Sequence, residues 1–233
     1  MATKRSYGEA CRFAHALDLV GERWALLVVR ELLLGPKRFT DLRTGLPHAS
    51  SNMLSERLRD LEQGGVIQRR KLPPPAASWV YELTEWGREL EPIVTKLGAW
   101  GARSPFPPET QEIGPDSIVL ALRSLFDPEA TGDLDTNYEL KIGDERFSVE
   151  IAEGKLDLGR GPASDPVASI TVPDAPTLAA ILTDQLPLEE ALNSGAAQIE
   201  GGKQTAKRFL RFFPMPESYA CSTVEELAAV TVA

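Results

Sequence analysis

The order of local signals in residues 46–87 restricts the fold of this chain more than any other feature of the sequence. Ser50 and Ser51 can cap the first turn of a helix, and the pair Gly64-Gly65 can end it. Between these limits the leucines recur at helical spacing and share one face, at Leu54, Leu58 and Leu61. The segment therefore predicts an amphipathic helix whose other face is polar.

Two short strands and a turn follow this helix. Val66 begins a strand that runs through three basic residues into a triple proline, whose rigid backbone without N–H donors suits a hairpin tip. In the return strand, residues 79–83, Trp79, Tyr81 and Leu83 share one face, and Thr84 can cap a further helix. Each piece alone is common in any α+β domain. Their order, with a short helix from Phe39 before them, favours a winged helix-turn-helix that binds DNA.

The charge of the chain is divided unevenly between its two halves. Residues 1–104 contain 16 Lys and Arg against 12 Asp and Glu, whereas residues 105–233 contain 9 against 22. Attraction to phosphate acts within a Debye length, about 10 Å at 0.1 M salt. We therefore expect the first half to bind DNA and the acidic second half to face away from it.

A proline-rich stretch separates these halves. We expect a DNA-binding domain in residues 1–104, a semi-rigid linker in residues 105–115, and an α+β domain in residues 116–233. The sequence contains neither an apolar run of about 18 residues nor a signal peptide, which predicts a cytoplasmic protein without membrane contact. Cys11 and Cys221 lie in different expected domains and form no CxxC motif or Cys/His cluster, so no metal site is predicted.

Several motifs of the first half together resemble a known family. The strings ALDLVGERW (residues 16–24), LLLGPKRF (32–39), SERLRDLE (55–62) and YELT (81–84) are similar to those of HxlR-type transcriptional regulators. The resemblance covers about residues 7–103. It implies a homodimer, in which the first and last helices of this domain pair, and two reading helices on a near-palindromic operator in double-stranded DNA.

The polar positions of the predicted reading helix are candidates for base recognition. Asn suits adenine and Arg suits guanine through paired hydrogen bonds in the major groove, and the candidates are Ser51, Asn52, Ser55 and Arg59. Ser50, at the helix start, belongs to the same DNA-binding set. Basic residues are expected to neutralise phosphates, or to reach the minor groove from the wing: Lys37, Arg38, Arg57, Arg69, Arg70 and Lys71.

Cys11 stands where some HxlR-type relatives carry a redox-sensing thiol, although Arg12 replaces the proline that often follows in that family. Two interpretations stay open. In one, Arg12 lowers the pKa of the thiol and makes Cys11 a redox sensor. In the other, Cys11 is a small buried side chain at a dimer interface.

The second half predicts an α+β domain with a mainly antiparallel sheet. Strands that alternate apolar and polar residues are expected at residues 138–142, 146–151 and 155–158, with two further strands at 168–172 and 197–200. Helices are expected at residues 116–126, 175–183, 188–194 and 205–213. The string SITV (169–172), the segments 178–182 and 196–202 and the closing Phe-rich helix resemble a sterol-carrier-protein-like fold. That resemblance implies an apolar tunnel for a lipid-like ligand, with candidate wall residues Phe147, Ile151, Leu178, Ile181, Leu182, Phe209 and Phe213. A filled core is the alternative for each of them.

Motifs for catalysis are incomplete. Gly159-Arg160-Gly161 lacks a third glycine, and the segment around Lys203 lacks the leading glycine and the Ser/Thr of a P-loop. His15 and His48 both lie in the first half, which argues against a Ser-His-Asp arrangement in the second. We therefore predict a protein that is not an enzyme and needs no cofactor.

Together these features predict a dimeric, sequence-specific transcription regulator, by default a repressor, whose second domain senses a small apolar ligand or aids assembly. The alternative is a lipid-carrier or assembly module whose winged domain mainly makes protein contacts.

Overall fold

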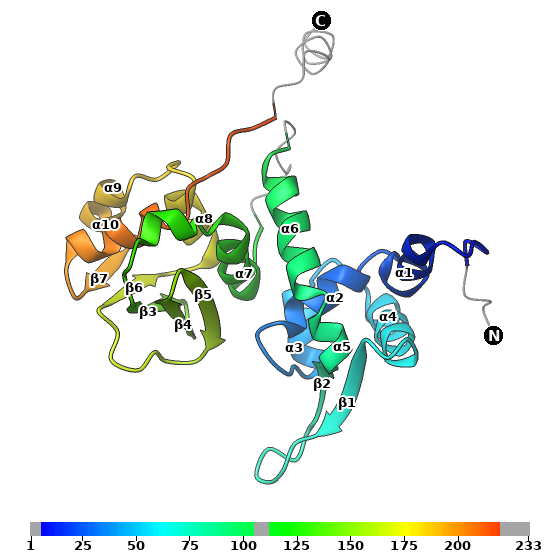
Figure 1. The fold of residues 1–233 in the computed structure, drawn as a ribbon. Coiled ribbons are helices and arrows are strands. Elements are labelled where there is room, and N and C mark those ends of the chain that lie inside the picture. Colours follow the sequence, from blue (N-terminus) through cyan, green and yellow to red (C-terminus); the bar gives the residue numbers. More distant parts are fainter. Residues whose placement is uncertain (1–5, 105–111, 220–233) are drawn as a thin grey trace, which may run out of the picture. The chain divides into compact units, whose positions relative to one another are not determined.

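The structure is a computed structural model that describes residues 6–104 and 112–219 (Figure 1). The chain divides into two units between Val94 and Thr95, inside the helix α6 (Glu91–Ala102). Residues 105–111 of the expected linker, and Cys221, lie outside the described residues. Within the described ranges no helix is long and apolar enough to span a membrane.

The first unit is a winged helix-turn-helix, as predicted. Its elements are α1 (Arg12–Val20), α2 (Ala25–Leu32), α3 (Phe39–Gly45), α4 (Ser51–Gln63), β1 (Ile67–Lys71), β2 (Trp79–Leu83), α5 (Glu85–Arg88) and the start of α6. The strands β1 and β2 pair antiparallel and form the wing, the hairpin that extends away from the helices in Figure 1. Lys37 adds a backbone bridge to β2, because its N–H donates to the Tyr81 carbonyl at 3.0 Å and its carbonyl accepts from Tyr81 at 2.8 Å.

The helix caps expected from the sequence are present. The Ser50 hydroxyl accepts a hydrogen bond from the Met53 backbone N–H at 3.2 Å, and Thr84 does the same for Gly87 at 2.9 Å. The leucine face of α4 is buried, with Leu54, Leu58 and Leu61 at most 1% exposed, and α4 packs against α1, α2 and β1. This burial leaves the polar face of α4 at the surface.

The second unit is an α+β layer built on one five-stranded sheet. Its elements are α7 (Pro115–Leu125), the 3-10 helix η1 (Pro128–Thr131), β3 (Thr136–Ile142), β4 (Glu145–Ala152), β5 (Lys155–Arg160), β6 (Ala168–Val172), α8 (Ala175–Leu182), α9 (Leu188–Ser194), β7 (Gln198–Glu200) and α10 (Lys203–Arg211). The strand order is β5-β4-β3-β6-β7.

The sheet is mixed, because β6 runs parallel to β3 while the other three pairings are antiparallel. The alternation of residues 138–158 predicts the hairpins that join β3, β4 and β5. It does not reveal the direction of β6, which depends on how residues 161–167 carry the chain across the sheet to the other side of β3.

One face of this sheet carries the core of the second unit. Tyr138 lies opposite Val149, and the Tyr138 ring packs 5.0 Å from the Phe209 ring, which lies 4.9 Å from the Phe213 ring. All seven candidate wall residues are buried, none more than 9% exposed. They are part of the buried apolar core of the second unit.

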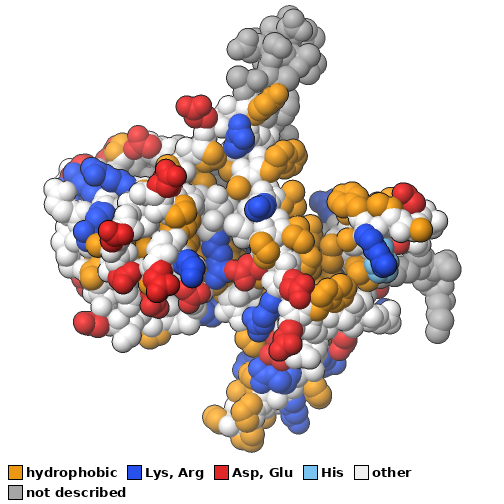
Figure 2. All heavy atoms as spheres, in the orientation of Figure 1, with side chains coloured by type: hydrophobic (Ala, Val, Ile, Leu, Met, Phe, Trp, Pro, Cys, Tyr) orange, Lys and Arg blue, Asp and Glu red, His pale blue; other side chains and the backbone are white. Residues whose placement is uncertain are grey.

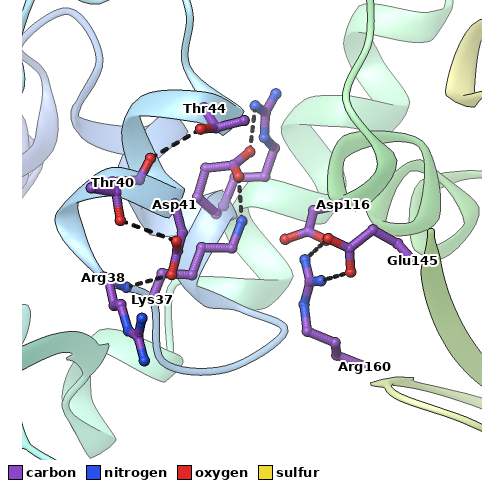
Figure 3. A network of polar contacts seen from close by, with 10 residues as sticks. Lys37, Arg38, Thr40, Asp41, Thr44, Asp116, Glu145 and Arg160 are labelled. Carbon is purple, nitrogen blue, oxygen red and sulfur yellow. Dashed lines mark hydrogen bonds and ion pairs between the residues drawn. The ribbon is translucent and has the colours of Figure 1, made fainter. Parts of the chain in front are cut away.

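An ion cluster joins the start of α7 to the edge of this sheet. The Arg160 guanidinium on β5 contacts the carboxylates of Asp116 and Glu145, as Figure 3 shows. The Arg160 guanidinium also lies over the Phe147 ring, with its carbon 5.2 Å from the ring centroid. These contacts give α7 a defined position on the sheet.

Candidate nucleic-acid interface

Helix α4 presents the predicted base-reading residues to solvent. Ser51, Asn52, Ser55 and Arg59 are all exposed on the side opposite the leucine face. The Ser55 hydroxyl donates to the Ser51 carbonyl at 2.7 Å, so its lone pairs remain open to an outside donor. Glu56 and Glu62 are exposed on the same helix and would repel phosphate. These polar side chains of α4 are therefore all accessible from outside the molecule.

The basic residues near α3 divide into one exposed and one buried side chain. Arg38, before the first turn of α3, is exposed, and its backbone N–H donates to the Asp41 carboxylate at 3.0 Å (Figure 3). Lys37 is only 8% exposed, and its ammonium pairs with the carboxylate of Glu31 on α2. A second oxygen of Glu31 accepts from Arg30 at 2.9 Å. Lys37 thus links α2 to the wing and is not placed to neutralise phosphate.

Arg57 is a second cation that the structure buries. It is 6% exposed, donates to the Asp60 carboxylate at 2.8 Å and lies 3.8 Å from the Met53 sulfur. Its position on α4 is next to the leucine face, since positions 54, 57, 58 and 61 all lie on the buried side. Arg57 therefore contributes to packing of the reading helix.

On one side of the wing, Arg70 is bound within the protein. Its guanidinium donates three hydrogen bonds of 2.8–3.0 Å to the Glu82 carboxylate, which also accepts from Gln68 at 2.9 Å. The hydrogen bonds from Arg70 hold the pKa of Glu82 below its ordinary value, against the effect of burial. The same contacts raise the pKa of Arg70.

On the other side of the wing, Arg69 lies next to two aromatic rings. Its guanidinium carbon is 4.7 Å from the Trp79 ring centroid and 5.9 Å from that of Tyr81. Trp79 is 50% exposed, and Lys71 is exposed opposite it in the strand register. Sequence reasoning did not select Trp79 or Tyr81 as site residues. The signal was present, since alternation in paired strands places aromatic residues and cations on one face.

Cys11 occupies the N-cap position of α1 and is exposed in the single chain. Hydrogen bonds from the backbone N–H groups of Ala14 and Phe13 lower the pKa of its thiol. The cause is the start of the helix rather than the charge of Arg12 considered from the sequence. Interpretation of Cys11 as a buried side chain requires a partner copy to cover it.

An apolar groove lies between α1 and the segment from α5 to α6. It is lined by Ala16, Leu19, Val20, Val66, Trp86, Glu89, Leu90 and Ile93. Within the described part of the chain, α6 has no buried residue although its sequence is largely apolar. Its exposed side chains include Ile93, Leu97 and Trp100, and Figure 2 shows orange side chains gathered over α6.

Among residues 6–104 and 112–219, no three His, Cys, Asp or Glu side chains gather as a metal site would require.

The buried pair of Lys37 and Glu31 generates a stability prediction. We expect Lys37→Met to reduce the free energy of unfolding by roughly 3 kcal/mol, because the buried Glu31 carboxylate loses its ammonium partner. The double variant Glu31→Leu/Lys37→Met should lose less, since it removes both charges. Urea unfolding of both variants checks this, and a double variant as unstable as the single one would contradict it.

The position of Cys11 generates a prediction about pH. In a Cys221→Ser background, alkylation of Cys11 by iodoacetamide should reach half its maximal rate at a lower pH than for cysteine in an unstructured peptide. The backbone N–H groups favour the thiolate, so more of it is present at neutral pH. A Cys11→Ser variant gives the background rate, and a pH profile equal to that of the peptide would show that the helix start does not act on the thiol.

The comparisons with known proteins concern the first part of the chain. A family model described as HxlR-like helix-turn-helix matches residues 19–106. YvaP, an HTH-type transcriptional regulator of Bacillus subtilis strain 168, is 40% identical over 93 residues, which are 40% of this chain and 86% of YvaP. YodB, an HTH-type transcriptional regulator of the same organism, is 39% identical over 85 residues, which are 36% of this chain and 76% of YodB.

Solved structures match the same part. The reduced form of YodB from B. subtilis is 34% identical with a TM-score of 0.39, over 43% of this chain and 99% of that chain. The redox regulator HypR in its oxidised form is 34% identical with a TM-score of 0.38, over 42% of this chain and 100% of that chain. With most of YvaP and YodB aligned at 39–40% identity, this chain belongs to the HxlR-like helix-turn-helix family of transcriptional regulators.

Proposed function

We propose that the protein binds a near-palindromic operator as a homodimer and represses transcription, with α4 as its reading helix. The observation that carries this proposal is the exposed polar face of α4, held outward by the buried leucine face and the Ser50 cap. Asn52 and Arg59 can form paired hydrogen bonds with adenine and guanine. Ser51 and Ser55 offer hydroxyl groups beside them, and the first N–H groups of α4, next to Ser50, are candidates for a phosphate contact.

The exposed cations of the first unit are the candidates for phosphate contact. Arg38, Arg69 and Lys71 are exposed, whereas Lys37 and Arg57 are buried in ion pairs and Arg70 is bound to Glu82. We therefore assign Lys37 and Arg57 to the positioning of the reading helix and the wing, and only the exposed cations to direct attraction of DNA.

Dimerisation is proposed through α1 and α6. Phe13 is 71% exposed and Trp100 is 76% exposed, and large apolar side chains at such exposure favour a protein partner. The stripe Ile93, Leu97 and Trp100 recurs at helical spacing along α6. A second copy that covers this stripe would supply the two reading helices that a two-fold operator requires.

The reading-helix proposal is tested by operator binding. With an operator selected from random DNA by the protein itself, Asn52→Ala and Arg59→Ala should each weaken binding by about 1–3 kcal/mol and relax the base preference at one operator position. Gln63→Ala, at the exposed end of the same helix, is the matched control and should bind as the unchanged protein does. Equal losses on selected and unrelated DNA would remove these residues from base recognition.

We infer that the second unit has the sterol-carrier-like arrangement expected from the sequence and binds an apolar ligand with one polar group. The strand order β5-β4-β3-β6-β7 with one parallel pair supports the arrangement. Two buried side-chain oxygens, of Thr136 and Tyr138, have no hydrogen-bond partner among the described residues, which supports a polar group nearby. A ligand among the buried wall residues must displace part of the aromatic packing. It would regulate DNA binding only if its binding free energies for two states of the dimer differ, by about 1–3 kcal/mol in typical coupling.

Native mass spectrometry of the protein from its host tests dimer and ligand together. We expect the mass of a dimer with additional bound mass. Leu97→Glu should give a monomer, because a charge in the apolar stripe is costly to bury, while Lys96→Glu adds the same side chain at an already charged position and should stay dimeric. A monomeric unchanged protein would overturn the two-fold operator proposal. A clean dimer would leave the second unit a structural role, and failure to retain any operator would favour the lipid-carrier or assembly alternative.

A further inference from the structure

The two faces of the wing differ in the partners of their charged side chains. The register pairs Arg69 with Tyr81 and Lys71 with Trp79, so these four side chains share one face of the hairpin. Gln68, Arg70 and Glu82 lie on the opposite face. The first set is called the aromatic face below, and the second the paired face.

The paired face has little to offer DNA. Arg70 donates to both oxygens of Glu82, and Gln68 donates to one of them. This ion pair is neutral overall, and Glu82 is only 9% exposed. A phosphate that approached Arg70 would have to compete with a carboxylate already held by hydrogen bonds of 2.8–3.0 Å.

On the aromatic face, by contrast, the cations are available to an outside partner. Lys71 and Arg69 are exposed, and the Arg69 guanidinium lies near two rings at 4.7 and 5.9 Å. A guanidinium stacked on rings keeps its N–H edge free for an outside acceptor, and fewer of its rotamers remain to be lost on binding. Trp79, half exposed, adds a flat apolar surface of the kind that packs against sugars and bases.

The tip of the wing continues this surface. Residues 73–77 are three prolines and two alanines, all exposed and all without charge. Figure 2 shows orange and blue side chains together on the hairpin at the bottom of the view. The cations of the wing therefore stand beside an apolar tip, next to Trp79.

We propose that the wing binds the duplex that flanks the α4 site through its aromatic face, and that Trp79 and Tyr81 position Arg69 for this contact. The inference rests on the proposed function, because it requires that α4 reads an operator. It adds Trp79 as a DNA-contacting residue and Tyr81 as a positioning residue, and it removes Arg70 from the interface. Cations, a flat ring and an uncharged tip on one face fit the phosphates and sugars of one groove edge.

Charge-conserving variants separate this contact from simple attraction. Trp79→Ala and Arg69→Lys leave the net charge unchanged, yet each should weaken binding to a flanked operator about fivefold to tenfold, because the stacked guanidinium is lost. The slope of log affinity against log salt should stay the same for both. Lys71→Ala, by contrast, should reduce that slope by about one per bound wing.

The matched control lies on the paired face of the same hairpin. Arg70→Gln/Glu82→Gln also conserves net charge and keeps polar side chains at both positions, and it should bind within twofold of the unchanged protein. All variants should be measured on the selected operator with about ten flanking base pairs and on the same operator trimmed to the α4 site. The losses of Trp79→Ala and Arg69→Lys should disappear on the trimmed duplex, because the wing then has no DNA to contact.

The outcomes distinguish this inference from the proposed function. If the unchanged protein retains no operator, the proposed function fails. If it binds but both charge-conserving variants bind the flanked operator as well as it does, or lose affinity equally on the trimmed one, the wing inference alone is overturned. Arg69→Lys keeps the test valid should Trp79→Ala fold poorly, and the thermal unfolding midpoint of each variant identifies that case.

Discussion

Burial of the leucine face of α4 is the constraint on which the rest of the first unit depends. Leu54, Leu58 and Leu61 are almost fully buried, and their helix packs against α1, α2 and β1. Each such side chain contributes about 1.5–3 kcal/mol when it leaves water, so the helix has one stable orientation. The polar face is outward because the apolar face must be inward, and this single requirement places Asn52 and Arg59 at the surface.

Internal ion pairs then decide which cations remain available. Six basic residues were predicted to contact the DNA backbone, and all carry the same charge in the sequence. The structure buries Lys37 against Glu31 and Arg57 beside Asp60, and it binds Arg70 to Glu82. Separating such a cation from its carboxylate costs free energy, so these ion pairs stabilise the fold and are poorly suited to binding DNA phosphates. Arg38, Arg69 and Lys71 are at the surface, and so is Arg70, whose side chain is 46% exposed but is bound to Glu82.

The second unit shows where local patterns stop being informative. Hairpins follow from alternation and short turns, and the strands β3, β4 and β5 were found close to their predicted positions. The parallel pairing of β6 with β3 joins residues about 30 positions apart, and no local signal records it. The packing of the Tyr138, Phe209 and Phe213 rings is likewise a product of the folded layer.

The sequence by itself determined most of the helices and strands of this protein, their order, the caps of α4 and α5 and the family to which the first unit belongs. These depend on the spacing of residues along the chain, which a reader of the sequence has in full. Tertiary structure alone decided the direction of β6, the burial of Lys37 and Arg57, and the division of the wing into an aromatic and a paired face. Those properties depend on contacts between side chains that are far apart in the sequence, and these contacts form only when distant segments pack.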